Sequence, residues 1–225
     1  MKMFKNILQI WKGKDFLNHV LEDFNGMLDD TEEMFLLVCK KLIHNEGGED
    51  IKDKIYSIDR KVNALEKDIR KRVLEHLVVQ PSVDLSTSLL FMSVVKDAER
   101  LGDYAKNLYE VTNLLEKPID INKCKELFND IEGELAELFK QTKKAFIESD
   151  EDTAAKSWES KREIGTRCEA IIVTLSKSVL SVNEAVCFTL MARHFKRIAS
   201  HLTNIATSVI LPLSELDYFD ERRQG

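Results

Sequence analysis

The sequence predicts an all-α protein made of two tandem antiparallel three-helix bundles, with six long helices in all. Three observations predict it. Proline and glycine are scarce, with three and eight copies in 225 residues, and charged residues make up 32% of the chain, a composition that suits long helices. Apolar residues recur at every third or fourth position through six segments, as on the buried face of a helix. A stretch of the first half also recurs in the second, which indicates two similar structural units.

Three long helices are expected in the first half, which covers residues 1–117. Their expected limits are residues 15–45, 49–79 and 84–115. The turn NEGG follows the first helix, and Gln80–Pro81 ends the second. Residues 1–14 form a short amphipathic lead with lysines around an apolar face. That pattern suits either a cap on the bundle or contact with an anionic membrane or a partner.

The second half, residues 118–212, repeats this plan. Its helices are expected at residues 120–148, 152–177 and 179–211. Pro118 marks the link between the halves, and Pro212 is expected to end the last helix. The remaining residues, 213–225, are expected to form a polar and frayed tail.

Composition argues against several classes of protein. The net charge is −6 and there is no dense basic patch, so nucleic-acid binding is not expected. The four cysteines lack metal-ligand or redox spacing and are expected to be reduced core residues of a cytoplasmic protein. No apolar run approaches the roughly 18 residues of a membrane span and no signal peptide is visible, so the protein is expected to be peripheral to a membrane at most.

An enzyme is not expected either. The sequence has no glycine-rich phosphate loop, no H-E-x-x-H zinc motif and no G-x-S-x-G nucleophile motif. His194 and His201 lie seven residues apart and could face a metal ion together, but two histidines alone make a weak site.

An acidic stripe stands out on the third helix. Glu99, Asp103, Asn107 and Glu110 recur at helical spacing and share one face. Carboxylates four residues apart repel each other unless a cation lies between them. That cation could be Arg100, a lysine from another helix or a metal ion; a solvated acidic face is the alternative. Gly102 interrupts the same helix, and close approach of a neighbour is the usual reason for such a glycine.

The internal repeat changes these acidic positions. Aligning Arg197 with Arg100, an offset of 97 residues (197 − 100), also pairs Asn204 with Asn107 and Ile198 with Leu101. In this register Lys196 replaces Glu99, and Ser200 replaces Asp103. A second alignment sets Lys161 of the fifth helix against Asp59 of the second. Three carboxylates of the first half have therefore become two lysines and a serine.

The stretch ERLGDYAKN resembles the signature helix of the PhoU family, in which an acid-x-x-x-Asp element recurs in each of two three-helix bundles. The preceding IDRKVNALEKDIRKRVLEHLVVQP is similar to the second helix of that family. The family comprises phosphate-signalling regulators that bind metal clusters through these carboxylates. The resemblance therefore implies a phosphate-transport ATPase or a membrane sensor kinase as partner, and a homodimer is expected.

Carried over to this sequence, the resemblance implies a metal site in the first bundle at Glu99, Asp103 and Asp59. Accessory positions are Asn107, Glu110 and Glu66. A second site would be degenerate, since Lys196, Ser200 and Lys161 cannot replace hard anionic ligands. Carboxylate ligands favour iron, manganese or magnesium.

Two hypotheses of different classes follow. The first is a PhoU-like regulator of phosphate uptake and signalling that acts through protein–protein contacts and carries a metal site in its first bundle. The second is a metal-free helical interaction or adaptor module whose acidic face binds a basic partner surface. Metal content and the effect of neutralising Glu99 or Asp103 distinguish the two.

Overall fold

The computed structural model describes residues 15–48, 51–80 and 84–219. Over these ranges the chain is helical and contains no strand, as the sequence predicts. The helices are α2 (Asp15–Leu42), α3 (Ile51–Val79), α4 (Leu85–Val111), α5 (Ile121–Phe128), α6 (Ile131–Glu148), α7 (Glu151–Leu175) and α8 (Val182–Thr207), followed by the short 3₁₀ helix η1 (Leu213–Glu215). The lead at residues 1–14 lies outside the described residues. No helix within the described ranges has the length and apolarity needed to cross a membrane.

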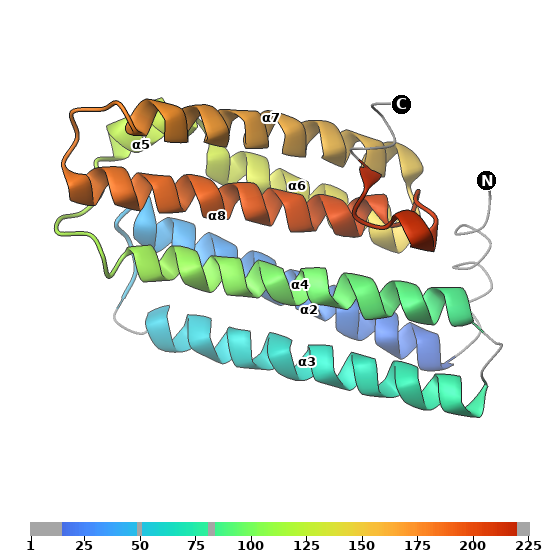
Figure 1. The fold of residues 1–225 in the computed structure, drawn as a ribbon. Helices are drawn as coiled ribbons and strands as arrows, with labels where there is room; N and C mark the ends of the chain where they lie inside the picture. Colours follow the sequence, from blue (N-terminus) through green and yellow to red (C-terminus); the bar gives the residue numbers. More distant parts are fainter. Residues whose placement is uncertain (1–14, 49–50, 81–83, 220–225) are drawn as a thin grey trace.

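The two predicted bundles are confirmed. Helices α2, α3 and α4 pack against one another, and α6, α7 and α8 do the same. The bundles meet where α4 packs on α8 and α2 packs on α6. In Figure 1, α3, α4, α8 and α7 lie side by side from bottom to top, with α2 and α6 behind them. The signature helix α4 and its repeat α8 are therefore neighbours at the centre of the molecule.

Phenylalanine side chains join the two bundles into one core. The ring centroids of Phe24 (α2) and Phe146 (α6) lie 4.8 Å apart, and those of Phe91 (α4) and Phe146 lie 5.9 Å apart. Further along, Phe35 of α2 lies 5.8 Å from Phe139 of α6. These distances are typical of interacting aromatic pairs. The buried apolar residues of both halves belong to one continuous cluster.

The prediction of one unbroken helix over 120–148 was wrong. The chain breaks between α5 and α6 because Asn129 adopts a positive φ of 57° with a ψ of −139°, which cannot continue a right-handed helix. Asp130 then caps α6, its side chain accepting a hydrogen bond from the backbone N–H of Gly133 at 3.2 Å. The long helix is therefore replaced by a short helix, a two-residue break and a second helix.

The prediction of a frayed tail was also wrong for its described part. Leu213 and Leu216 pack on the core, and Phe219 is buried. The ring of Phe219 lies 5.8 Å from that of Trp158 on α7. Apolar residues three apart give this segment one buried side. The polar composition of residues 213–225 as a whole led to the wrong prediction. The segment from 212 to 219 therefore belongs to the folded structure.

Candidate functional site

The predicted metal ligands of the first half lie on the facing sides of α3 and α4. Asp59 and Glu66 project from α3, Glu99 and Asp103 from α4. The side chains of Asp59, Glu66 and Glu99 are only 11–12% exposed. Carboxylates buried to this degree need compensating charge or hydrogen bonds, since desolvation disfavours the ionised form.

Lys106 of α4 supplies part of that charge. Its Nζ atom lies 3.0 Å from Oδ1 of Asp59 and 3.3 Å from Oδ1 of Asp103. Burial alone would lower the pKa of Lys106, but the hydrogen bonds with Asp59 and Asp103 outweigh it and raise the pKa. The ammonium group is therefore a charged bridge between two of the three predicted ligands.

The third predicted ligand is balanced in the same way. Lys96 Nζ lies 2.8 Å from Oε2 of Glu99, and Arg100 contacts both Glu99 and Asp103 at 3.9 and 3.8 Å. Lys96 also reaches Glu66 at 4.0 Å. Acids and bases thus alternate without a gap along α3 and α4. This charge network comprises Arg70, Glu66, Lys96, Glu99, Arg100, Asp103, Lys106 and Asp59.

The other accessory residues lie at the edge of this network. Glu110 accepts a hydrogen bond from the hydroxyl of Tyr56 on α3 at 3.4 Å. Asn107 lies half-buried on the same side of α4 as Asp103. Tyr56 and Glu110 therefore add one more link between the two helices.

In this arrangement the predicted metal ligands are already paired with side-chain cations. Across the described residues, no three His, Cys, Asp or Glu side chains are grouped so as to hold one. The chemistry of the donors suits a hard cation, but lysine and arginine side chains are in contact with each of Asp59, Glu99 and Asp103. The sequence allowed several cations between these carboxylates. In the structure, the cations beside them are the ammonium and guanidinium groups of lysine and arginine side chains from α4 itself.

The corresponding positions of the second half carry no carboxylates. Lys196 of α8 forms an ion pair with Glu169 of α7, and its hydrogen bond and positive charge lower the pKa of that carboxyl. Ser200 donates its hydroxyl to the carbonyl of Lys196 at 3.0 Å. Lys161 lies on α7, part-exposed. Of these positions, Lys196 links α8 to α7 through its ion pair with Glu169.

The seam between α4 and α8 contains a cluster that the sequence did not predict. Asp97 of α4 is buried and accepts hydrogen bonds from the side chains of His201 and Asn204 of α8, at 2.7 and 3.3 Å. Tyr104 stacks on the His201 ring with centroids 5.4 Å apart. The signal was present in the sequence, since Asp97 falls at an apolar spacing between Val94 and Leu101. This cluster ties the two bundles together.

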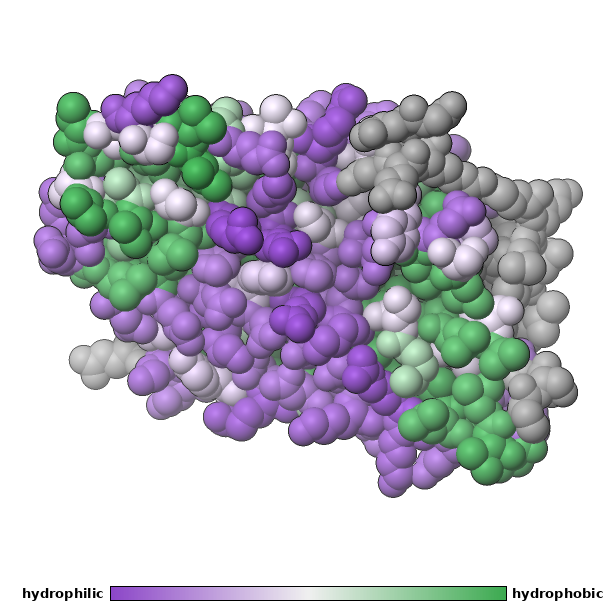
Figure 2. All heavy atoms as spheres, in the orientation of Figure 1, coloured by the Kyte–Doolittle hydropathy of each residue, from purple (hydrophilic) through white to green (hydrophobic). Residues whose placement is uncertain are grey.

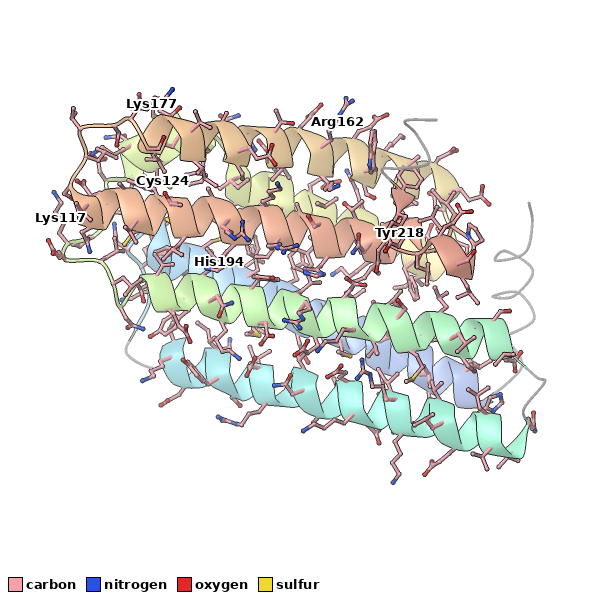
Figure 3. The ribbon with its side chains drawn as sticks, viewed as in Figure 1. Lys117, Cys124, Arg162, Lys177, His194 and Tyr218 are labelled. Carbon is pink, nitrogen blue, oxygen red and sulfur yellow. The ribbon has the colours of Figure 1, made fainter. Side chains whose placement is uncertain are left out.

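The two histidines that might have shared a metal ion have separate surroundings. His201 contacts Asp97, whereas His194 lies beside Tyr104 and has a buried Nδ1 atom without a hydrogen-bond partner among the described residues. Figure 3 shows His194 on α8, on the side of α4. Burial and the nearby charge of Arg193 lower the pKa of His194, which favours the neutral ring.

A second acidic surface lies on α2. Asp29, Glu32 and Glu33 line a shallow hollow together with Leu36, Leu37 and Lys40. Lys143 of α6 lies 3.0 Å from Asp29 and also contacts Glu32, while Lys54 of α3 pairs with Glu33. The acidic residues of α2 are therefore balanced by the neighbouring helices on both sides.

Gly102 does not mark an unusually close helix approach. A Cβ at this position would lie 3.7 Å from the Thr31 methyl, 3.8 Å from Met34 and 3.8 Å from Val62. These are ordinary van der Waals distances, so the prediction of close approach was wrong. The glycine is buried at the junction of α2, α3 and α4, where an alanine would fit.

Comparison with known proteins identifies relatives over both halves. The family model "PhoU domain" matches residues 24–112 and 128–209. The phosphate-specific transport system accessory protein PhoU homolog 1 of Thermotoga maritima is 26% identical over 201 residues, covering 85% of this chain and 79% of that protein. The corresponding PhoU homolog of Deinococcus radiodurans is 23% identical, covering 86% of this chain and 92% of that protein.

Solved structures share the fold. The phosphate transport system regulatory protein PhoU from Streptococcus pneumoniae superposes with a TM-score of 0.75 at 17% identity, covering 90% of this chain and 95% of that one. PhoU from Pseudomonas aeruginosa gives a TM-score of 0.72 at 20% identity, covering 87% and 95%. At these identities the likeness concerns the arrangement of the helices.

Proposed function

The chain belongs to the PhoU family, and we propose on this premise that it is an accessory regulator of phosphate transport that acts through protein contacts. The observation that carries the proposal is the match of the family model to both halves of the chain. Relatives named as accessory proteins of phosphate-specific transport support it over more than four fifths of the chain. The proposal does not require catalysis.

The partner that we propose is either the ATPase of a phosphate transporter or a phosphate sensor kinase, contacted from the cytoplasmic side of the membrane. A homodimer is part of the same proposal. Sedimentation equilibrium of the purified full chain at several concentrations tests the dimer, because a monomer mass at all concentrations would contradict it.

Phosphate uptake in cells tests the regulatory role. A strain lacking this gene is compared with its parent and with the strain carrying the gene on a plasmid, at high and at low external phosphate. We expect the deletion to weaken the difference in uptake between the two phosphate levels, and the plasmid copy to restore it. Uptake that responds to phosphate equally in all three strains would exclude the proposed function.

The metal site at Glu99, Asp103 and Asp59 stays a prediction. We propose that a hard cation such as iron, manganese or magnesium reaches these carboxylates only in competition with Lys96 and Lys106. The proposal is supported by the contacts of both lysines with the predicted ligands. The two hypotheses raised by the sequence differ here. In a metal-binding regulator the cation would displace the two lysines from the carboxylates, whereas in a metal-free adaptor the lysines would stay in contact with them.

The α2 hollow gives the metal-free alternative a specific surface. Its acidic residues flank Leu36, which is 39% exposed. An apolar and basic segment of a partner would pack on Leu36 and replace Lys54 and Lys143 beside the carboxylates. Substituting Asp29→Lys and Glu33→Lys together tests this, with binding of the purified transport ATPase measured by calorimetry. Under the alternative the affinity falls at least tenfold, whereas unchanged affinity excludes the hollow as the contact surface.

A further inference from the structure

One exposed face of α8 combines aliphatic and cationic side chains. Val182, Val186, Arg193 and Arg197 follow one another at i, i+4, i+11 and i+15, a spacing that puts all four on one narrow side of a helix. Val182 is 81% exposed and Val186 is 47% exposed, and both arginines are exposed. We refer to these four residues as the α8 stripe.

The same pattern occurs on α4. At the repeat offset of 97 residues, Leu85, Leu89, Lys96 and Arg100 correspond to the four residues of the α8 stripe. Leu85 and Leu89 are 46% and 47% exposed, and Arg100 is exposed. We refer to them as the α4 stripe. Both halves therefore place two aliphatic residues and then two cations on the outer side of the corresponding helix.

The two stripes lie on one face of the molecule. Helices α4 and α8 are adjacent and run in opposite directions in Figure 1, so their aliphatic ends are at opposite ends of the face. Figure 2 shows the result, with apolar areas at the lower right and upper left and a hydrophilic band between them. The hairpin tips add Val78 and Val79 at one end and Val179 at the other, each more than three quarters exposed.

Within the described part of the chain, the two arginines of the α8 stripe have no acidic partner. Neither Arg193 nor Arg197 forms an ion pair with any described residue, and α8 has no Asp or Glu after Glu184. On α4, by contrast, Lys96 and Arg100 are already paired with Glu99 and Asp103. Two cations four residues apart repel each other, so an anion beside Arg193 and Arg197 would stabilise this region.

We infer that this face rests on an anionic phospholipid surface, with the two aliphatic ends in the interfacial region and Arg193 and Arg197 against lipid phosphates. Binding of an amphipathic surface to a bilayer grows with the apolar area buried and with the attraction of its cations to anionic lipid. A protein partner would need two apolar sockets in register with the two ends. A bilayer accepts both ends without preformed sockets, which is why these observations favour lipid.

Attraction of the chain as a whole does not explain such binding. The net charge is −6, so an anionic membrane repels the molecule except where cations are concentrated. The inference therefore depends on the α8 stripe itself, and it holds whether or not the chain regulates phosphate transport.

Co-sedimentation with vesicles tests the inference on the full chain. One set of vesicles contains equal parts of phosphatidylglycerol and phosphatidylcholine, and the other contains phosphatidylcholine alone. We expect binding to the anionic vesicles that weakens with added salt. Arg193→Gln with Arg197→Gln should lower the partition coefficient about 25-fold, from roughly fivefold for each charge near an anionic surface. Val182→Ser with Val186→Ser should lower it as well.

Lys125→Gln with Lys140→Gln is the matched control. It removes two exposed cations from α5 and α6, which lie behind α7 and α8 in Figure 1, and should change binding less than twofold. Circular dichroism and melting temperature of each variant verify that folding is intact. Absence of binding to anionic vesicles overturns the inference, and a protein partner would then account for the face. Equal binding by all variants also overturns it, because another part of the chain would be the contact.

Discussion

The Nζ atom of Lys106 lies 3.0 Å from Oδ1 of Asp59, and this contact joins α4 to α3 at the centre of the predicted metal site. Lys106 also contacts Asp103 at 3.3 Å. A side chain of the protein thus occupies the position between two carboxylates where a bound cation was expected. Several consequences of this charge network can be measured.

Replacing Lys106 with Met should destabilise the fold. The change leaves Asp59, whose side chain is only 12% exposed, without its cation. Removing one partner of a buried or partly buried pair costs about 1–3 kcal/mol. Urea unfolding of both proteins measures the difference. Lys71→Met is the control, because Lys71 and Glu75 are 72% and 64% exposed and such a surface pair contributes less than about 0.5 kcal/mol. Equal losses in the two variants would contradict the role given to Lys106.

The sequence predicted the helices better than it predicted their ends and interruptions. Apolar spacing located α3 to within two residues of its observed limits, Ile51–Val79, because a long amphipathic helix repeats its signal many times. The break at Asn129 was missed because it depends on the backbone conformation of one residue inside an otherwise regular pattern. Asp130 could have revealed it, as an N-cap residue ahead of an apolar position.

For the candidate site, too, relations within one helix were predictable from the sequence, whereas contacts between helices were not. Helical spacing correctly put Glu99 and Asp103 on one face of α4, since that relation is local to one helix. Which residue of α3 faces them depends on the rotation of one helix against the other, and spacing alone does not determine it. The contacts of Lys106 with Asp59 and of Asp97 with His201 are of this second kind. They became visible only with the helices packed.

The start of α7 should lose stability in acid. The side chain of Asp150 accepts hydrogen bonds from the backbone N–H and hydroxyl of Thr153, and these bonds lower the pKa of Asp150 to about 2. A carboxyl with a lowered pKa stabilises the fold above its ordinary pKa of 3.8 and loses that contribution as pH falls towards 2. We expect Asp150→Ala to cost about 1 kcal/mol at pH 7.

The pH dependence separates capping from other effects at Asp150. The difference between wild type and Asp150→Ala, measured by urea unfolding, should narrow between about pH 4 and pH 2. Asp152→Ala serves as the control, because it removes a carboxylate from the same first turn. A difference at Asp150 that stays constant down to pH 2 would show that the charge of its carboxylate is not responsible.

Alanine at position 102 should stabilise the protein. The added Cβ would meet its neighbours at ordinary distances of 3.7–3.8 Å, and alanine is favoured over glycine inside a helix by about 0.5–1 kcal/mol. Thermal unfolding of Gly102→Ala measures the gain. Gly165→Ala on α7 is a matched case, since its Cβ would have 4.0 Å to Lys196. Destabilisation by Gly102→Ala alone would mean that α2 and α3 lie closer to α4 than described.

The shared core predicts that the two bundles unfold together. Phe146 of α6 is buried against Phe24 and Phe91 of the first bundle, so Phe146→Ala should cost about 3–5 kcal/mol. The loss should appear in a single transition for both halves. Circular dichroism follows the whole chain. The fluorescence of Trp158 follows the second bundle, and it is measured in a Trp11→Phe background because the chain has two tryptophans. Two separate transitions in the wild-type protein would contradict a common core.

The most direct test of the charge network is a comparison of metal content in three forms of the full chain. Each form is exposed to iron, manganese or magnesium, and free metal is then removed. The three forms are wild type, Lys106→Met, and Lys106→Met combined with Asp103→Asn. Elemental mass spectrometry gives the ions bound per chain. Competition between Lys106 and a metal ion predicts more metal in Lys106→Met than in wild type, and a return towards the wild-type content in the double variant. Equal metal content in wild type and Lys106→Met, whether high or zero, would contradict that competition.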